Sequence, residues 1–288
     1  MEDCLLRTPL RGGDRVSTQP DHDANIQAYY SLGHEDARLT TRSVGGRLEY
    51  ERVRRIVSAH LAPGTRVLDV GGGTGVHSRW LAEAGHEVTL LDPVASQVEV
   101  AAGHGGFEAL VGDARDLPVP DRSADAVLLF GPLYHLVSVE DRRAALDEAR
   151  RALRPGGLVF AQGISRLTAF VDTTVAGGYD ALEPPDLEIL RTGEWTSAGE
   201  GFPGGHFHTA AELREEVERS GFEEVEVHGL EGPNVGALEA LAAGDELVRL
   251  GLELVETLEQ QLGAAGHSPE LLADYSPHMM AVGRAPRR

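Results

Sequence analysis

The chain has 288 residues, of which 41% are hydrophobic and 25% are charged, and its formal net charge at pH 7 is −20. One large domain with a complete hydrophobic core accounts for this length. Residues 181–270 contain 20 acidic and 4 basic residues. Such a surface repels phosphate backbones, which argues against DNA or RNA as the substrate. All 26 basic residues are arginine, and the lack of lysine excludes Schiff-base catalysis and a P-loop.

The sequence has no feature typical of a membrane or secreted protein. No stretch of about 18 apolar residues occurs, so no membrane-spanning helix is expected. The N-terminal residues carry early charges and no apolar core, unlike a secretion signal. Cys4 is the single cysteine, which excludes an internal disulfide and suits a reducing compartment. We therefore expect a cytoplasmic protein without a membrane partner.

The first part of the chain is predicted to be largely helical. Residues 1–20 are expected to form a flexible N-terminal segment, followed by a single domain over residues 21–288. Residues 26–32 favour the start of a helix, and apolar residues recur at helical spacing over residues 47–61. Pro63 and Gly64 end that second helix.

From Arg66 onward, short apolar runs alternate with helical segments. Parallel strands joined by helices form a doubly wound, Rossmann-like α/β sheet. A turn at residues 154–157 is expected to precede the fifth strand. The strands are predicted at residues 67–70, 86–91, 107–111, 124–130, 158–162, 225–228 and 278–283, with the main helices between them at residues 76–84, 93–102, 138–153 and 209–220.

Two segments interrupt this alternation. Residues 164–205 contain Gly and Pro pairs and few aliphatic residues in phase, which predicts an insertion over the carboxyl edge of the sheet. Residues 232–276 predict a helical insertion before the last strand, with a long amphipathic helix region over residues 238–262. Trp195 and Phe202 lie in the first insertion, where they either line a substrate pocket or anchor the segment.

A glycine-rich turn follows the first predicted strand. Glycine lets the backbone adopt positive φ and approach a ligand closely, and the helix that follows offers unpaired N–H groups. The dinucleotide fingerprint G-x-G-x-x-G would need a third glycine where the chain has Val76. The pattern acidic-x-Gly-x-Gly-x-Gly, formed by Asp69, Gly71, Gly73 and Gly75, instead resembles motif I of the class I S-adenosylmethionine-dependent methyltransferases.

This resemblance extends from about Tyr50 to Gly283 and implies S-adenosyl-L-methionine as the cofactor, with S-adenosyl-L-homocysteine as its product. It also implies a seven-stranded sheet whose last strand is antiparallel, preceded by a helical lid over residues 21–62. In that family the glycine turn packs against the methionine part of the cofactor. The acidic residue, here Asp69, helps to orient the turn and the cofactor's amino group.

Two further carboxylates match positions of the family's cofactor site. Asp92 follows the second predicted strand, where a carboxylate binds both ribose hydroxyls, and it can also cap the next helix. The run Gly112-Asp113-Ala114 resembles the family's adenine-edge motif. In this reading Asp113 faces the adenine amino group and the Ala114 N–H faces a ring nitrogen, whereas Asp113 alternatively closes a turn.

The segment after strand 124–130 lies at the switch point of such a sheet. Phe130 and Gly131 are expected beside the methionine of the cofactor. DNA methyltransferases that act on amino groups have the pattern Asn/Asp/Ser-Pro-Pro-aromatic at this place. Residues 131–136 depart from this pattern at Gly131 and Leu133, which argues against methylation of nucleobase amino groups. His135 is the candidate general base because imidazole titrates near neutral pH, and Tyr134 is a candidate for positioning the acceptor. Alternatively, His135 hydrogen-bonds a loop or forms the floor of the cofactor pocket.

His206 and His208 form a second histidine cluster. Alternation places both imidazoles on one side of an extended segment. With a carboxylate they could hold a metal, but the sequence offers no recognisable third ligand. We therefore expect them to be substrate-pocket or surface groups, and we expect no metal.

Aromatic and basic residues also occur in the predicted lid. Tyr30 is expected to close over the cofactor, and Tyr29 and Arg42 are expected to contact the acceptor. The alternative is an exposed amphipathic helix, in which these residues, together with Arg38 and Arg47, have no role in binding.

We therefore predict transfer of a methyl group to an O or N nucleophile of a small-molecule metabolite by in-line displacement. Holding the nucleophile, methyl group and sulfur in line supplies most of the rate enhancement. One alternative is an NAD-dependent oxidoreductase, which Val76 and the 112–114 motif disfavour. The other is a cofactor-binding protein without transfer activity. The sequence does not indicate the oligomeric state.

Overall fold

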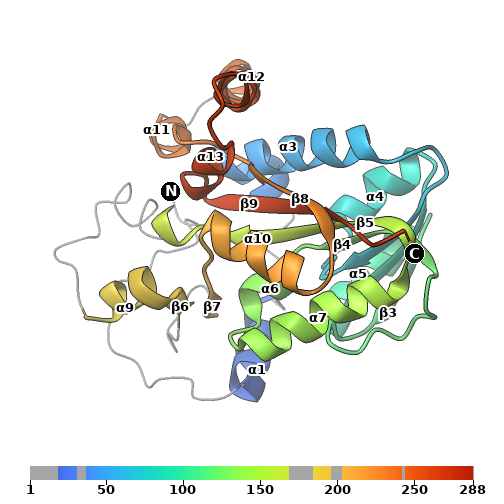
Figure 1. Cartoon of the computed structure of the whole chain (residues 1–288). Helices are drawn as coiled ribbons and strands as arrows, with labels where there is room; N and C mark the ends of the chain where they lie inside the picture. The colour runs from blue at the N-terminus through green and yellow to red at the C-terminus, as the bar shows by residue number, and fades with distance from the viewer. Residues whose placement is uncertain (1–18, 31–36, 169–183, 196–202, 242–243, 288) are drawn as a thin grey trace.

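A seven-stranded sheet forms the centre of the protein (Figure 1). The computed structural model describes residues 19–30, 37–168, 184–195, 203–241 and 244–287. The strand order is β3-β2-β1-β4-β5-β9-β8, and β9 is antiparallel to both neighbours, which confirms the predicted architecture. The strands are β1 (Arg66–Val70), β2 (Glu87–Asp92), β3 (Glu108–Val111), β4 (Ala124–Leu129), β5 (Leu153–Ile164), β8 (Glu223–Gly229) and β9 (His278–Arg284).

Helices cover both faces of this sheet. The α7 helix (Val139–Ala152) and α10 (Ala210–Arg219) contribute to the core on one face, and α3 (Val44–His60) and α4 (Val76–Glu83) to the core on the other. Successive strand residues alternate between the two cores, so that Leu68 packs in the first and Val67 in the second. This burial on both faces explains the nearly continuous apolar runs of the parallel strands.

The remaining helical segments lie before, between and beyond these layers. They are α1 (Gln19–Tyr30), the π-helix η1 (Arg38–Arg42), α5 (Ala95–His104), α6 (Pro132–His135), the 3-10 helix η2 (Arg166–Thr168), α9 (Pro184–Thr192), α11 (Val235–Ala240), α12 (Asp245–Ala264) and α13 (Glu270–Asp274). No helix in the described part of the chain is both long and apolar enough to cross a membrane.

Two helix starts are fixed by side-chain caps. The Ser138 hydroxyl accepts a hydrogen bond from the Asp141 N–H (3.0 Å) at the start of α7. Thr209 and Glu212 form the complete capping box predicted at the start of α10, in which each side chain bonds the other residue's N–H.

The predicted amphipathic region before the last strand consists of two helices. The apolar stripe of α12, including Val248 and Leu252, packs against Val44 and Leu48 of α3, outside the main sheet (Figure 1). Arg52 of α3 also pairs with acidic residues of α12. The helical insertion therefore extends the layer formed by α3.

Three details differ from the sequence prediction. Residues 154–157 belong to β5 rather than to a turn before it, because Ala124 of β4 pairs with Leu153 and the register then shifts across an irregularity. The α1 helix begins at Gln19, well before residue 26. A two-stranded sheet of β6 (Glu194–Trp195) and β7 (Gly205–His206), too short to leave a periodic pattern, was not predicted.

Candidate active site

The candidate site is a pocket where the turns after β1 and β4 meet. These two strands are hydrogen-bonded neighbours, and the Phe130 N–H donates to the Val70 carbonyl (3.2 Å). Gly71 has φ of +81°, and a Cβ there would lie 2.5 Å from the Phe130 carbonyl oxygen. Only glycine allows this close approach. The backbone of residues 71–74 consequently lines the pocket directly.

Most residues predicted to bind the cofactor are brought together here. Gly75 is the exception, because it does not line the pocket. It is the N-cap of α4, has φ of +89°, and packs against the ring of Phe107. Both residues predicted to act on the acceptor, Tyr134 and His135, also line the pocket. The predicted cofactor residues in the lining are Tyr30, Asp69, Gly71, Gly73, Asp92, Asp113, Ala114, Phe130 and Gly131.

Asp69 is fully buried beneath the glycine turn. Its Oδ2 accepts a hydrogen bond from the Ser78 hydroxyl (2.7 Å), whereas its Oδ1 has no hydrogen-bond partner among the described residues. Burial raises the pKa of Asp69 to about 6, and the nearby charge of Asp92 adds to the rise. A buried carboxylate oxygen without a donor beside a pocket fits a cationic ligand, such as an ammonium or sulfonium group.

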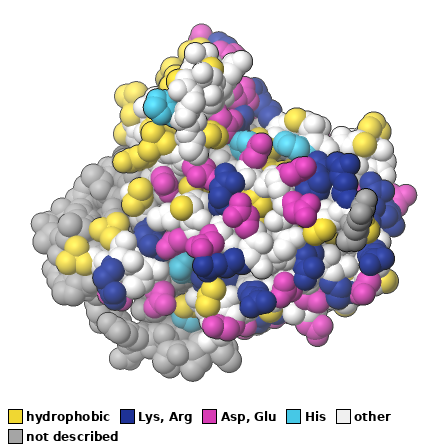
Figure 2. Space-filling view, in the orientation of Figure 1, with side chains coloured by type: hydrophobic (Ala, Val, Ile, Leu, Met, Phe, Trp, Pro, Cys, Tyr) yellow, Lys and Arg dark blue, Asp and Glu magenta, His cyan; other side chains and the backbone are white. Residues whose placement is uncertain are grey.

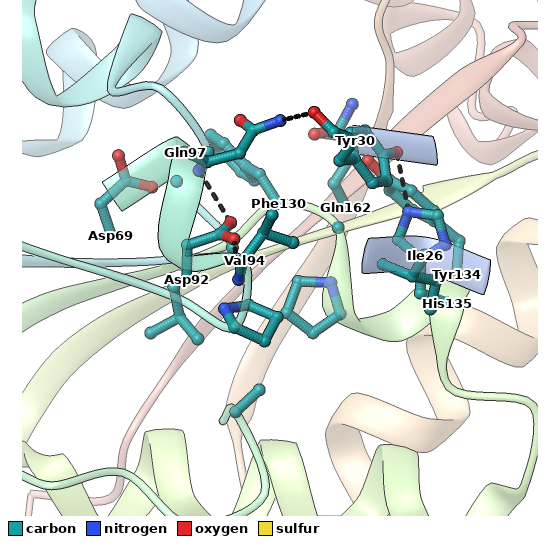
Figure 3. Close-up of a pocket in the computed structure, with 18 of the residues that line it drawn as sticks. Ile26, Tyr30, Asp69, Asp92, Val94, Gln97, Phe130, Tyr134, His135 and Gln162 are labelled. Carbon is teal, nitrogen blue, oxygen red and sulfur yellow. Dashed lines mark hydrogen bonds between the residues drawn. The ribbon is translucent and has the colours of Figure 1, made fainter. Parts of the chain in front are cut away.

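Asp92 ends β2, the neighbour of β1, and its carboxylate contacts the glycine turn. Its Oδ1 accepts from the Val94 N–H (2.8 Å) and its Oδ2 from the Gly73 N–H (2.9 Å) (Figure 3). Burial raises the pKa of this carboxyl, and the two backbone hydrogen bonds oppose the rise. The N-cap of α5 is Val94, and no side chain caps this helix, so the alternative of Asp92 as the helix cap was wrong. Asp92 instead accepts from the N–H of Val94 in the turn before the helix. Ribose binding by Asp92 stays a prediction.

Asp113 closes a turn in this structure. Its Oδ1 accepts from the backbone N–H of Arg115 (2.8 Å), and the Arg115 guanidinium bonds both carboxylate oxygens. Arg115 also pairs with Asp23 of α1 (2.9 Å), which joins the first helix to the edge of the pocket. Although burial opposes it, Arg115 holds the pKa of Asp113 below its usual value. Contact with adenine stays a prediction.

His135 and Tyr30 are in direct contact at the other end of the pocket (Figure 3). The Tyr30 Oη lies 2.8 Å from His135 Nε2, and the Tyr30 carbonyl accepts from the Gln97 amide (2.5 Å). Burial lowers the pKa of His135 to about 3, although a hydrogen bond with the Gly204 backbone opposes the change. The expectation that His135 titrates near neutrality was therefore wrong, because its burial could not be read from the sequence.

Sequence reasoning missed several polar residues that line the pocket. Glu49 of α3 pairs with Arg38 (2.8 Å) and accepts from the Gln162 amide (2.6 Å). Burial opposes ionisation of Glu49, but Arg38 and His278 lower its pKa to about 2. A signal was present, because Glu49 is in helical phase with the apolar residues of α3, and Gln162 interrupts an apolar strand. Gln97, which bonds Tyr30, had no comparable signal.

Five predicted substrate residues do not line this pocket. Tyr29 packs edge-on against Tyr30 (5.1 Å between ring centroids), and Trp195 packs against Phe207 (5.3 Å). Phe202 lies outside the described residues. The other three residues of this set are Arg42, at the end of η1, and His206 and His208, which lie together near the end of β5.

A doubly wound sheet with a glycine turn and buried carboxylates at its switch point defines a protein that binds a nucleoside-containing cofactor. The methyltransferase domain family matches residues 68–161. A ubiquinone/menaquinone biosynthesis C-methyltransferase of Caulobacter vibrioides is 34% identical over 198 residues, which cover 62% of this chain and 75% of that protein. A malonyl-[acyl-carrier protein] O-methyltransferase of Serratia marcescens is 35% identical over 127 residues, covering 44% and 46%.

Solved structures show the same fold at low sequence identity. A phosphoethanolamine N-methyltransferase of Haemonchus contortus, bound to phosphomonomethylethanolamine and S-adenosylhomocysteine, has a TM-score of 0.58 and 19% identity, covering 94% of this chain and 61% of that one. A methyltransferase of Thermotoga maritima has a TM-score of 0.54 and 18% identity, covering 93% and 100%. The chain belongs to the class I S-adenosylmethionine-dependent methyltransferases, and its cofactor is S-adenosylmethionine.

The pKa of Asp69 predicts how cofactor binding depends on pH. A cationic cofactor favours the ionised carboxylate, so that binding below pH 6 requires loss of the Asp69 proton. We expect affinity for S-adenosylmethionine to be up to about tenfold lower at pH 5 than at pH 7, as measured by calorimetry. The Asp69→Asn variant should bind more weakly and without this pH dependence. Equal wild-type affinity at both pH values, or the same dependence in the variant, would contradict the role of Asp69.

Proposed function

We propose that the protein methylates a small-molecule acceptor held between α1 and the turn after β4. The observation that carries this proposal is the arrangement of one pocket, with the glycine turn and carboxylates at one end and the Tyr30–His135 pair at the other. S-Adenosylmethionine supplies an electrophilic methyl group on a sulfonium. The chain orients the acceptor, excludes water and receives the acceptor's proton.

The acceptor end of the pocket combines apolar and aromatic surface with polar groups such as Gln162 (Figure 3). Ile26 of α1, Phe130 and Leu136 contribute apolar surface, and the rings of Tyr30 and Tyr134 both pack against His135. A flat ring bearing a hydroxyl group fits such walls better than a highly charged metabolite does. The relative named for C-methylation in quinone biosynthesis supports an acceptor of this kind.

The sequence predicted an oxygen or nitrogen nucleophile. A phenolic acceptor adds a third possible nucleophile, the ring carbon beside its hydroxyl group. The hydroxyl oxygen of a neutral phenol donates electron density into the ring and makes the adjacent ring carbon nucleophilic as well. Attack on the methyl group by either atom leaves a cation that must lose a proton. Attack by oxygen and attack by carbon therefore both require a group that removes a proton from the acceptor. The same pocket serves both reactions, and the orientation of the ring against the methyl group selects between them.

His135 is the residue that we assign to this proton transfer. Its low pKa keeps the imidazole neutral at physiological pH, so that it retains a nitrogen lone pair. An imidazole with a pKa of about 3 is too weak a base to ionise a phenol before the reaction. Once the acceptor has attacked the methyl group, however, it becomes a far stronger acid than imidazolium. The proton then moves from the acceptor to His135 Nε2, directly or through the Tyr30 hydroxyl.

The acceptor class is tested with labelled S-adenosylmethionine and a library of phenols, quinols, amines and carboxylic acids. We expect labelled product from phenols or quinols, with methyl on oxygen or on the adjacent ring carbon. Product from amines alone would contradict the proposed acceptor. If the protein binds S-adenosylhomocysteine but no compound in a broad library is labelled, the alternative of a cofactor-binding protein without transfer activity is favoured.

His135→Ala should reduce turnover of the best acceptor by about 10²-fold or more, because general bases contribute on this scale. Affinity for S-adenosylhomocysteine should stay within about twofold, because the substitution lies at the acceptor end of the pocket. Tyr30→Phe keeps the ring and should give a smaller loss. His104→Ala, at an exposed histidine of α5, serves as the control.

The pH profile tests whether His135 stays neutral over the physiological pH range. Since the pKa of His135 is about 3, wild-type turnover should show no acidic limb near pH 6.5 that disappears in His135→Ala. Such a limb, or unchanged turnover in the variant, would rule out proton transfer to a buried neutral His135.

A further inference from the structure

The two histidines outside the pocket have a carboxylate beside them that the sequence did not reveal. His206 is in β7, His208 follows two residues later, and Glu216 comes from α10. One imidazole nitrogen of each histidine and a carboxylate oxygen of Glu216 all lie within 4.8 Å of one another. The two ring centroids are 4.5 Å apart. The fold thus supplies the third ligand whose absence made a metal seem improbable.

The backbone holds this cluster in place. The His208 N–H donates to the Ile164 carbonyl (2.8 Å), and the Arg166 N–H donates to the His208 carbonyl (2.8 Å), which attaches the segment to the end of β5. The capping box at Thr209 starts α10 immediately afterwards, so that Glu216 faces back toward His208. These side chains are therefore preorganised rather than gathered from mobile surface positions.

The imidazole nitrogens of the cluster are only partly hydrogen-bonded. The Nδ1 atoms of His206 and His208 are buried and form no hydrogen bond within the described residues. The Nε2 atom of His208 is the nitrogen that faces Glu216. A neutral imidazole and an ionised carboxylate are the forms that bind metals.

The distance between His208 and Glu216 matches tetrahedral coordination. The His208 Nε2 and Glu216 Oε2 atoms are 3.3 Å apart, which is long for a charge-assisted hydrogen bond. Two ligands bonded to zinc at about 2.0–2.1 Å in tetrahedral geometry lie about 3.4 Å apart. Arg142 donates to both carboxylate oxygens of Glu216, from Nη2 to Oε1 (2.6 Å) and from Nε to Oε2 (2.9 Å). It also donates to the carbonyls of Leu136 and Val137, so it orients the carboxylate.

A second buried cluster of histidine and carboxylates gives a useful contrast. Glu49, Glu231 and His278 also have ligand atoms within 4.8 Å of one another. There, however, Glu49 is bonded by Arg38 and Gln162, and Glu231 is bonded by the ring and the backbone N–H of His278. Both clusters pair a glutamate with an arginine. Among the described residues, however, the cluster at His278 has no imidazole nitrogen that is buried without a partner, whereas the cluster at His206 has two.

We propose that His206, His208 and Glu216 bind one divalent transition-metal ion, with Zn²⁺ the best match, and that solvent completes the tetrahedron. Two histidines and one glutamate form a known type of zinc ligand set. The ion would fasten β7 to α10 and β5. Because the Gly205 backbone lies directly against the Tyr134 carbonyl, this fastening would also fix the segment that carries Tyr134 and His135. The ion has no part in methyl transfer itself, and the proposal stands apart from the acceptor assignment.

The proposal is tested by calorimetric titration of the chelator-treated full chain with ZnCl₂. We expect one Zn²⁺ per chain with a micromolar or lower Kd, a higher Tm with Zn²⁺, and a tetrahedral absorption spectrum when Co²⁺ replaces Zn²⁺. His206→Ala, His208→Ala and Glu216→Gln should each weaken binding at least about tenfold and remove the Tm increase. Far-UV circular dichroism without metal establishes that each variant is folded, and His206→Asn replaces any variant that is not.

His228→Ala is the matched control. His228 contacts Glu259, which also pairs with Arg52, so this group repeats the histidine, glutamate and arginine arrangement without a second histidine. The control variant should bind Zn²⁺ as the wild type does. Absence of binding to the wild type, or equal binding by wild type and the folded variants at His206 and His208, would overturn the proposal.

Discussion

The close contact between the turns after β1 and β4 is the constraint on which the rest of the site depends. Gly71 approaches the Phe130 carbonyl so closely that a single Cβ would separate the two turns. This contact exists because β1 and β4 are neighbours in the sheet while the chain leaves them in different directions. Because the chain diverges after these two strands, a pocket forms between them. Its floor is backbone, and its side chains come from distant parts of the sequence.

Electrostatics explains why this pocket suits a cationic nucleoside. Asp69 and Asp92 are both buried, and burial raises the pKa of each. Backbone N–H groups satisfy Asp92, but an oxygen of Asp69 lacks a donor in the described structure. A positively charged ligand offsets the unfavourable burial of the Asp69 carboxylate. The fold thus carries a cost before the ligand binds, and relief of this cost contributes to the binding free energy. The acceptor end, by contrast, holds a neutral imidazole beside aromatic rings.

The sheet and the cofactor end of the pocket were predictable because their signals are local. Short, nearly continuous apolar runs predicted the strands, and the spacing of Asp69 and the glycines predicted the turn after β1. The capping box at Thr209 predicted the start of α10. The acceptor end was less predictable because its contacts join residues far apart in sequence. Tyr30 meets His135 across 105 positions, and Glu49 meets Gln162 across 113. Burial, and with it the low pKa of His135, depends on such contacts and has no local pattern.

The central claim is that the glycine turn and its two carboxylates seat a sulfonium nucleoside. The most direct measurement is calorimetric titration of the wild type and of Asp92→Asn with S-adenosylhomocysteine and, separately, with NAD. The account predicts that the wild type binds S-adenosylhomocysteine with one site per chain and does not bind NAD, and that Asp92→Asn binds at least about tenfold more weakly because it loses a charged acceptor for the ribose hydroxyls. Binding of NAD in place of S-adenosylhomocysteine, or an unchanged affinity in Asp92→Asn, would contradict it.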